Sequence, residues 1–384
     1  MDKKSSRKKK KMARTSDHEA VPMAAASHLT SWRDLIADPT HRKKLAQTLS
    51  GFIYNTHDRV DPRFYHFHFA DISVGATPPV DPSLPFLPHD EYLYVAQLDT
   101  CNGLLLCRGY MASSSTDKNL DVPAESHYVV CNPATKRWID LPPNPKEPLS
   151  GRVIARLAFD PAASPQFHVF QFEENDQEPF PYITGVNIYS SQTGAWNHRQ
   201  SRLAEKISLS GGLTSVFFQG MLHLLGLLHP ISMDEDAILV AVDMEGQVWK
   251  TVRVPSGGFS FGTIGLSQGC LHYSTTPLAK KKQKVTKIAA VWCMKDYDSK
   301  DWVLKHTVSG DDLPSATRVL YKVAAIHPDH DTIFLDASKA DTLASYDMQH
   351  RKFCHILDLK KKKGVLFLPY VPLFSDSLPG AHGQ

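Results

Sequence analysis

The sequence predicts an all-β protein, a β-propeller of about six four-stranded blades. Two observations lead to this prediction. A hairpin-like motif recurs five times at intervals near fifty residues, and a short apolar strand recurs upstream of it in each repeat. The propeller is expected to follow a disordered basic tail and a short helical segment. The predicted boundaries are 1–26 for the tail, 27–50 for the helical segment, 51–377 for the propeller and 378–384 for a C-terminal tail.

The tail is rich in Lys, Ser and Ala and has no hydrophobic periodicity. Its first 14 residues contain eight Lys or Arg and one acid, a charge of +7 within a net +3, so the rest of the chain is acidic. We therefore do not expect nucleic acid as a partner. The basic run is typical of a nuclear import signal or of a solvated tail, and we expect the nucleus and/or the cytoplasm as the location. The residues of such a signal are Arg7, Lys8, Lys9, Lys10 and Lys11.

The helical segment begins at a Ser-x-x-Asp capping pair, Ser31 with Asp34. Trp32, Leu35 and Ile36 then recur at helical spacing and share one face. An Asp-Pro step ends this helix and can start a second one. Two helices this short bury too little surface alone, so they must pack against the propeller or another protein.

The repeat is aligned by its aromatic residues, which are 58, 53, 53 and 51 residues apart. A turn-forming residue stands six positions before each one. Apolar residues precede the turn and the aromatic opens the returning strand, which is the pattern of a β-hairpin with a longer loop. We expect each aromatic to pack between neighbouring sheets. The aromatics are Trp138, Trp196, Trp249, Trp302 and Phe353, and the turn residues are Asn132, Ser190, Asp243, Asp296 and Asp347.

A second apolar strand lies upstream of each hairpin. Gly precedes this strand in "NGLLLC" (102–107), "QGMLHLL" (219–225) and "QGCLHYS" (268–274), and the segments 165–172 and 331–337 take the same place without Gly. Each repeat therefore has enough strands for a four-stranded sheet. The sixth blade is expected to combine "GFIYN" and "RFYHFHFADI" from the N-terminal side with "GVLFLPYVPLF" from the C-terminal side. Joining the two ends of the chain in one blade closes such a ring.

Composition argues against several other classes. The hydrophobic fraction of 42% and the charged fraction of 22% are those of an ordinary globular protein. No apolar run of about 18 residues is present, so a membrane is not expected as a partner. No apolar segment follows the basic cluster, which argues against a secretory signal. The six cysteines include no Cys-x-x-Cys pair, and we interpret them as small hydrophobes in a reducing compartment, not as zinc ligands.

Enzymatic and metal-binding alternatives have less support. His66 and His68 share one face of a strand, as two metal ligands would, but no third ligand is identifiable. The segment "HPDHD" (327–331) is interpreted as a turn that connects blades. No Gly-rich phosphate loop, Gly-x-Ser-x-Gly elbow or His-Glu-x-x-His helix is present. We expect no catalytic residue, no metal and no cofactor, although some propellers are enzymes.

The motifs together resemble a known family, the plant F-box proteins with an F-box-associated, kelch-like β-propeller domain. The resemblance extends from about Ser27 to Pro379. It implies an F-box that docks on the Skp-type adaptor of an SCF-type cullin–RING E3 ubiquitin ligase, and a propeller that holds an unknown protein substrate. The matching landmarks are "SWRDLIADPTHRKK", "LSGFIY", "CNGLLLC", "YVVCNPATKRWIDLPP", "FDPAASPQFHVFQF", "IYSSQTGAW" and "LPYVPLFSDSL".

The chain departs from this family within the F-box. In the family this motif has three helices, whereas here "SHLT" joins directly onto "SWRDLIAD". Residues 27–50 therefore correspond to a partial F-box with its C-terminal helices only, and Trp32, Leu35 and Ile36 are the adaptor-binding remnant that the resemblance implies. The first hypothesis is a substrate-recognition subunit of the ligase. The alternatives are an interaction module that has lost adaptor binding and a propeller enzyme.

Overall fold

A computed structural model gives the fold of the propeller region. No α-helix occurs among the residues that the structure describes, and no helix there is long and apolar enough to cross a membrane. Residues 1–47, which contain the predicted tail and all but the last three residues of the partial F-box, lie outside the described residues. The structure describes residues 48–57, 65–72, 80–88, 91–111, 126–145, 153–175, 180–209, 214–229, 237–255, 262–276, 287–294, 300–312, 321–337, 342–358, 366–375 and 378.

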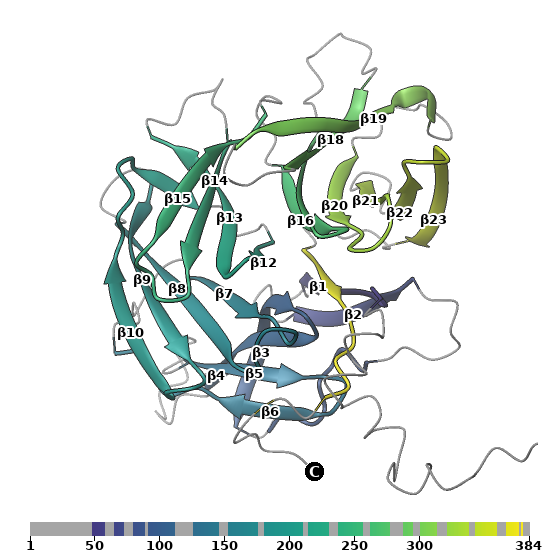
Figure 1. Cartoon of the computed structure of the whole chain (residues 1–384). Coiled ribbons are helices and arrows are strands. Elements are labelled where there is room, and N and C mark those ends of the chain that lie inside the picture. The colour runs from purple at the N-terminus through teal and green to yellow at the C-terminus, as the bar shows by residue number, and fades with distance from the viewer. Residues whose placement is uncertain are drawn as a thin grey trace, which may run out of the picture.

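Six antiparallel sheets are arranged around a ring, which confirms the predicted six-bladed propeller (Figure 1). We number the blades along the chain, and within each the strands run from the ring centre outward. The first blade consists of β3 (Tyr92–Cys101), β4 (Leu104–Met111), β5 (Ser126–Asn132) and β6 (Arg137–Asp140). The second consists of β7 (Ile154–Phe159), β8 (Phe167–Asn175), β9 (Tyr182–Ser190) and β10 (Ala195–Gln200).

The third blade differs in its inner strand, which is divided into β11 and β12. Both pieces pair with the same edge of β13, one at each end. The blade therefore keeps the four-stranded plan with an interrupted inner strand. Its strands are β11 (Ile207–Leu209), β12 (Val216–Phe218), β13 (Met221–Leu228), β14 (Ala237–Asp243) and β15 (Trp249–Arg253).

The fourth and fifth blades repeat the four-stranded plan, and a short 3₁₀ turn, η2 (Gly310–Asp312), follows the fourth. The fourth blade consists of β16 (Thr263–Ser267), β17 (Cys270–Thr275), β18 (Lys287–Met294) and β19 (Trp302–Ser309). The fifth consists of β20 (Lys322–Ile326), β21 (Thr332–Ala337), β22 (Thr342–Asp347) and β23 (Lys352–Asp358).

The closing blade joins the two sides of the chain, as predicted. β24 (Phe367–Tyr370) pairs with β1 (Gly51–His57), which pairs in turn with β2 (Tyr65–Asp71). These three are the strands of this blade among the described residues. The inner strand β24 contacts the inner strands of its neighbours, β20 and β3, so the ring is continuous.

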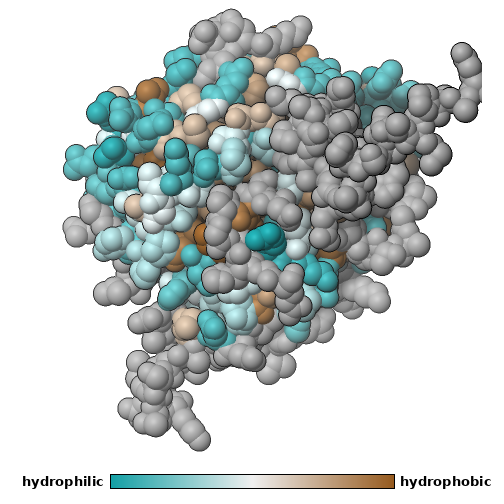
Figure 2. All heavy atoms as spheres, turned by 60° about the horizontal axis from the view of Figure 1, so that its bottom comes forward, coloured by the Kyte–Doolittle hydropathy of each residue, from teal (hydrophilic) through white to brown (hydrophobic). Residues whose placement is uncertain are grey.

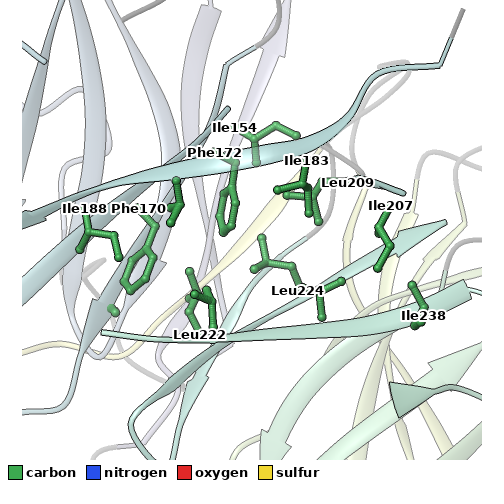
Figure 3. Close-up of a cluster of buried hydrophobic side chains, with 14 residues drawn as sticks. Ile154, Phe170, Phe172, Ile183, Ile188, Ile207, Leu209, Leu222, Leu224 and Ile238 are labelled. Carbon is green, nitrogen blue, oxygen red and sulfur yellow. The ribbon is translucent and has the colours of Figure 1, made fainter. Parts of the chain in front are cut away.

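Hydrophobic side chains fill the space between the blades. Six buried clusters occur in the described part of the chain, and each lies between two neighbouring sheets. Figure 3 shows the cluster between the second and third blades, where Phe170 and Phe172 point toward Leu222 and Leu224. Because each sheet is covered on both faces, its strands have long buried runs, such as all six residues of β7.

Candidate protein-binding site on the propeller

The five aromatic residues of the repeat occupy one structural position. Trp138, Trp196, Trp249, Trp302 and Phe353 each stand first or second in the outermost strand of a blade. Each is partly buried against the cluster shared with the preceding blade. Two indole nitrogens also donate across that boundary: Trp196 to the carbonyl of Pro142 at 2.7 Å, and Trp302 to that of Arg253 at 3.1 Å. These residues therefore join blades to one another.

The turn residues end the third strand of their blades. The side chains of Asn132, Asp243 and Asp347 accept hydrogen bonds from backbone N–H groups two to four residues further on, which starts each reversal. Asp296, the equivalent residue of the fourth blade, lies outside the described residues. The aromatic and turn residues thus build the hairpins, and their positions explain the period of the sequence.

A buried polar group connects three inner strands near the centre of the ring. Asp99 on β3 accepts hydrogen bonds from the N–H of Leu157 on β7, at 2.9 Å, and from the hydroxyl of Ser215 beside β12, at 2.7 Å. Burial raises the pKa of Asp99, while the nearby Arg156 guanidinium and these hydrogen bonds act in the opposite direction. The Asp99 carboxyl group, which belongs to the first blade, therefore links this blade to the second and third blades.

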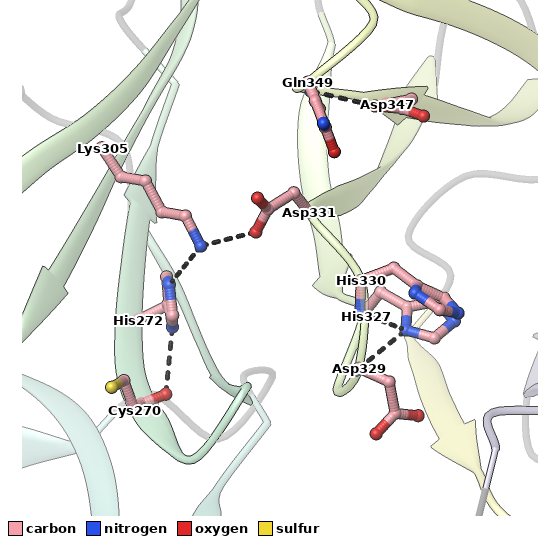
Figure 4. A network of polar contacts seen from close by, with 9 residues as sticks. All are labelled: Cys270, His272, Lys305, His327, Asp329, His330, Asp331, Asp347 and Gln349. Carbon is pink, nitrogen blue, oxygen red and sulfur yellow. Dashed lines mark hydrogen bonds and ion pairs between the residues drawn. The ribbon is translucent and has the colours of Figure 1, made fainter.

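A second polar group lies between the fourth and fifth blades (Figure 4). The Lys305 ammonium is 2.6 Å from a carboxylate oxygen of Asp331 and 3.3 Å from Nε2 of His272. Nδ1 of His272 donates to the carbonyl of Cys270 at 3.0 Å, so Nε2 is the acceptor for Lys305. Burial lowers the pKa of His272, which favours this neutral ring. The three side chains hold the two blades together.

The segment "HPDHD" corrects one interpretation of the sequence. It connects β20 to β21 inside the fifth blade and does not connect blades. Nδ1 of His327 accepts from the N–H groups of Asp329 and His330, so this ring closes its own turn. On β2, Nε2 of His68 is 2.9 Å from the hydroxyl of Thr56. No group of three His, Cys, Asp or Glu residues that suits a metal ion occurs in the described part of the chain.

An aromatic patch lies on the surface of the propeller. We define it as Phe180, Tyr182, Lys206 and His229, and it lies where the second and third blades meet. The His229 ring stands edge to face with both Phe180 and Tyr182, at centroid distances of 6.4 Å and 5.8 Å. The Lys206 ammonium lies 4.6 Å from the centre of the Tyr182 ring. Phe180 is 51% exposed, so one large ring faces solvent.

Hydrogen bonds hold the aromatic patch in place. The Ser208 hydroxyl is 2.8 Å from Nε2 of His229 and also bonds the carbonyl of Pro181, the residue between the two aromatic rings. Asn175 donates to the phenol oxygen of Tyr182 at 3.0 Å. Rings fixed in this way lose little conformational entropy when a partner binds. These hydrogen bonds therefore hold the Tyr182 and His229 rings in a fixed arrangement.

The position of the aromatic patch follows from the order of the strands. Tyr182 begins β9, His229 follows β13 and Lys206 precedes β11. All three strand ends lie on one face of the ring. The tight turns, such as that at Gly220, lie on the opposite face. On the face of the molecule that Figure 2 shows, hydrophilic side chains cover much of the described surface, with smaller hydrophobic areas between them. The sequence does not reveal this patch, because its members are separated by up to 49 positions and only "PFPY" marks it locally.

The predicted adaptor-binding and import residues lie outside the described residues. This applies to Trp32, Leu35 and Ile36 of the partial F-box and to the basic run from Arg7 to Lys11. Their roles, and the domain boundaries based on them, stay predictions.

The fold and the aromatic patch define the class of protein, a six-bladed propeller with an exposed aromatic surface of the kind that protein interfaces use. The family described as "F-box protein At3g26010-like, beta-propeller" matches residues 83–369. The chain therefore belongs to this family of plant F-box proteins with a propeller domain.

Individual relatives are more distant. F-box protein At5g07610 of Arabidopsis thaliana is 27% identical over 176 residues, which cover 43% of this chain and 38% of that protein. Among solved structures, the acylaminoacyl peptidase of Pyrococcus horikoshii gives a TM-score of 0.39 at 12% identity, over 71% of this chain and 40% of that one. The propeller domain of the trilobed protease of Pyrococcus furiosus gives 0.38 at 12% identity, over 69% and 72%. Likeness at this level carries no functional argument.

Proposed function

We propose that this protein is the substrate-recognition subunit of an SCF-type cullin–RING E3 ubiquitin ligase. The propeller binds a target protein, and residues 27–50 contact the Skp-type adaptor. The subunit supplies proximity and performs no catalysis itself. Membership in a family of F-box proteins with a propeller supports this role.

The aromatic patch is the observation that carries the target-binding half of the proposal. Interfaces obtain much of their binding energy from a few aromatic side chains held in place before binding. Phe180 is such a side chain, because it is half exposed and its neighbours are fixed by hydrogen bonds. The polar groups around Asp99 and Lys305, by contrast, are engaged between blades.

The length of the helical segment favours a second candidate function. Residues 27–50 are too few for a three-helix F-box, and "SHLT" precedes "SWRDLIAD" directly. In this alternative, the chain is an interaction module that no longer binds the adaptor and competes with intact relatives for the same target.

Copurification with a plant Skp-type adaptor and cullin separates the two candidates. The full chain is compared with a chain that begins at Gly51. The ligase role predicts that the full chain retains the adaptor and that the shorter chain does not. Loss of the adaptor from both would leave the interaction module as the function.

The target-binding role predicts a strong effect at Phe180. Phe180→Ala is expected to weaken target binding by about 30-fold, the effect of losing one hot-spot side chain of about 2 kcal/mol. Val248→Ala is the matched control, because Val248 is 47% exposed on a hairpin of the third blade. Targets are identified by proximity labelling in plant cells and their affinities are measured with purified proteins. Equal affinities of the two variants would contradict the role of the aromatic patch.

The basic tail supports nuclear enrichment as a part of the same proposal. A fluorescent fusion that lacks residues 1–14 is expected to be less concentrated in the nucleus than the intact fusion. Equal distributions would remove the import function from Arg7–Lys11.

A further inference from the structure

The turn at residues 327–331, between β20 and β21 of the fifth blade, also contacts the fourth blade (Figure 4). Its Asp331 carboxylate is 2.6 Å from the Lys305 ammonium on β19. Its Pro328 carbonyl accepts from the N–H of Gln268 at 2.6 Å, and Gln268 belongs to the tight turn between β16 and β17. The 327–331 turn is therefore part of the boundary between the two blades.

A neutral histidine closes this turn from the inside. Nδ1 of His327 accepts from the N–H groups of Asp329 and His330, at 3.0 Å and 3.2 Å. A backbone N–H can only donate, so this nitrogen carries a lone pair, and a proton placed on it would remove both hydrogen bonds. Burial and the neighbouring His330 lower the pKa of His327, while Asp329 acts in the opposite direction. The neutral ring is therefore the form that fits the closed turn.

A second neutral histidine holds the lysine that contacts the turn. Lys305 lies between Asp331 and Nε2 of His272, and an ammonium group has no acceptor, so Nε2 carries a lone pair. Nδ1 of the same ring donates to the carbonyl of Cys270, and the residue opposite the ring on β18 is Cys293. Protonation of Nε2 would place an imidazolium N–H against the ammonium. Burial and the Lys305 charge lower the pKa of His272, and Asp331 raises it.

We propose that the 327–331 turn is a proton-controlled contact between the fourth and fifth blades, closed while His272 and His327 are neutral and released when they are protonated. The nitrogen that would take the proton is a hydrogen-bond acceptor in both rings. Protonation and closure therefore exclude each other. The inference concerns a local opening of the propeller and does not depend on the ligase role.

The direction and size of the effect follow from the linkage between protonation and opening. In the open turn each ring titrates near the ordinary histidine pKa of about 6.5, so opening increases as the pH falls below that value. Each ring that stays neutral in the closed turn raises the opening constant about 10-fold between pH 7.5 and pH 5.5, and two rings raise it about 100-fold. The apolar cluster between the blades does not titrate, so the release stays local.

The other hairpin turn of the fifth blade, at residues 347–351, provides an internal control. Its acceptor is the carboxylate of Asp347, which bonds the N–H groups of Gln349 and His350. Hydrogen bonds from His350 lower the pKa of Asp347, so this acceptor keeps its charge at pH 5.5. The two turns therefore differ in the one property that the proposal uses, the response of the acceptor to a proton.

Hydrogen–deuterium exchange of the full chain, measured by mass spectrometry on peptides from the two turns, tests the proposal. Exchange rates divided by the intrinsic rate at each pH report the local opening. Between pH 7.5 and pH 5.5, protection of the 327–331 turn is expected to fall by up to about 100-fold. Protection of the 347–351 turn is expected to stay unchanged. An equal fall in both turns, or no fall in the first, would overturn the proposal.

Two substitutions keep an acceptor at each position and remove the site of protonation. His272→Gln offers its amide oxygen to Lys305, and His327→Asn offers one to the N–H groups of the turn, as Asn132 does in the first blade. Each single variant is expected to retain about a 10-fold fall in protection, and the double variant none. A fall that persists in the double variant would contradict the proposal. Circular dichroism verifies folding at pH 7.5, and the comparison of the two turns in the unmodified chain needs no variant.

Discussion

At the scale of single residues, the buried histidines set a dependence of stability on pH. His223 lies on β13 with no exposed surface, and its Nδ1 bonds the carbonyl of Val216 at 3.2 Å. Burial lowers the pKa of His223 to about 4. The unfolded chain therefore binds a proton more readily than the folded one, and stability falls as the pH drops below about 6.5, the ordinary pKa of histidine.

The first prediction separates the contribution of His223 from that of the other histidines. Between pH 7 and pH 5 the unmodified protein is expected to lose about 2 kcal/mol more of its free energy of unfolding than His223→Gln does. The other buried histidines are present in both proteins, so their effects cancel in the comparison. Urea unfolding at the two pH values measures the difference. Equal losses would show that His223 is not protonated on unfolding.

At the scale of elements, two-residue turns join the first and second strands of three blades. They are Asn102-Gly103, Gln219-Gly220 and Gln268-Gly269, and both residues of each turn have positive φ angles. This is the geometry of a type I′ turn, whose twist matches that of the strands. Glycine accepts such angles without strain, which explains the Gly that precedes the apolar strand in the sequence.

The second prediction compares two of these glycines. Gly269→Ala is expected to cost about 1 to 2 kcal/mol, the penalty of a left-handed backbone, because no atom lies within 4 Å of the added methyl group. Gly103→Ala is expected to cost clearly more. Its methyl group would lie 2.4 Å from Cβ of Leu373 and 2.7 Å from the carbonyl oxygen of Val371. Chemical denaturation of both variants provides the test, and equal costs would contradict the close packing at Gly103.

At the scale of the whole molecule, the C-terminal segment holds the ring closed. β24 pairs with β1, and the residues after it cross to the first blade. There the buried side chain of Asn132 donates to the carbonyls of Leu373 and Ser375, at 2.8 Å and 3.2 Å. Thr100 donates to the carbonyl of Pro369 at 2.8 Å. The closure therefore depends on side chains as well as on strand pairing.

The third prediction concerns this closure. Asn132→Ala is expected to cost about 2 to 4 kcal/mol, because two buried carbonyl groups lose their donor. Asp347→Ala removes the equivalent side chain of the fifth blade, which bonds two exposed N–H groups and the exposed His350 ring of its own turn, and is expected to cost about 1 kcal/mol or less. Thermal and chemical unfolding compare the two. Similar costs would show that the C-terminal contacts of Asn132 add little.

The sequence by itself determined the repeated hairpins and the closing blade, and it indicated about six blades. These features rest on local patterns, because each hairpin needs a turn residue, a left-handed position and an aromatic at fixed spacing. The split inner strand of the third blade was not predicted, since β11 and β12 are recognised only by their common partner β13. The segment "HPDHD" was assigned to a connection between blades, because only the pairing of β20 with β21 shows that it lies inside one blade.

Only the tertiary structure decided which side chains come together. Phe180, Lys206 and His229 form one patch because two neighbouring blades place their strand ends side by side. Lys305 points to Asp331 because a bulge in β19 changes the direction of its side chain. Local sequence controls backbone geometry through short-range sterics and hydrogen bonds. Contacts between blades depend on how whole sheets pack, and no short stretch of sequence contains that information.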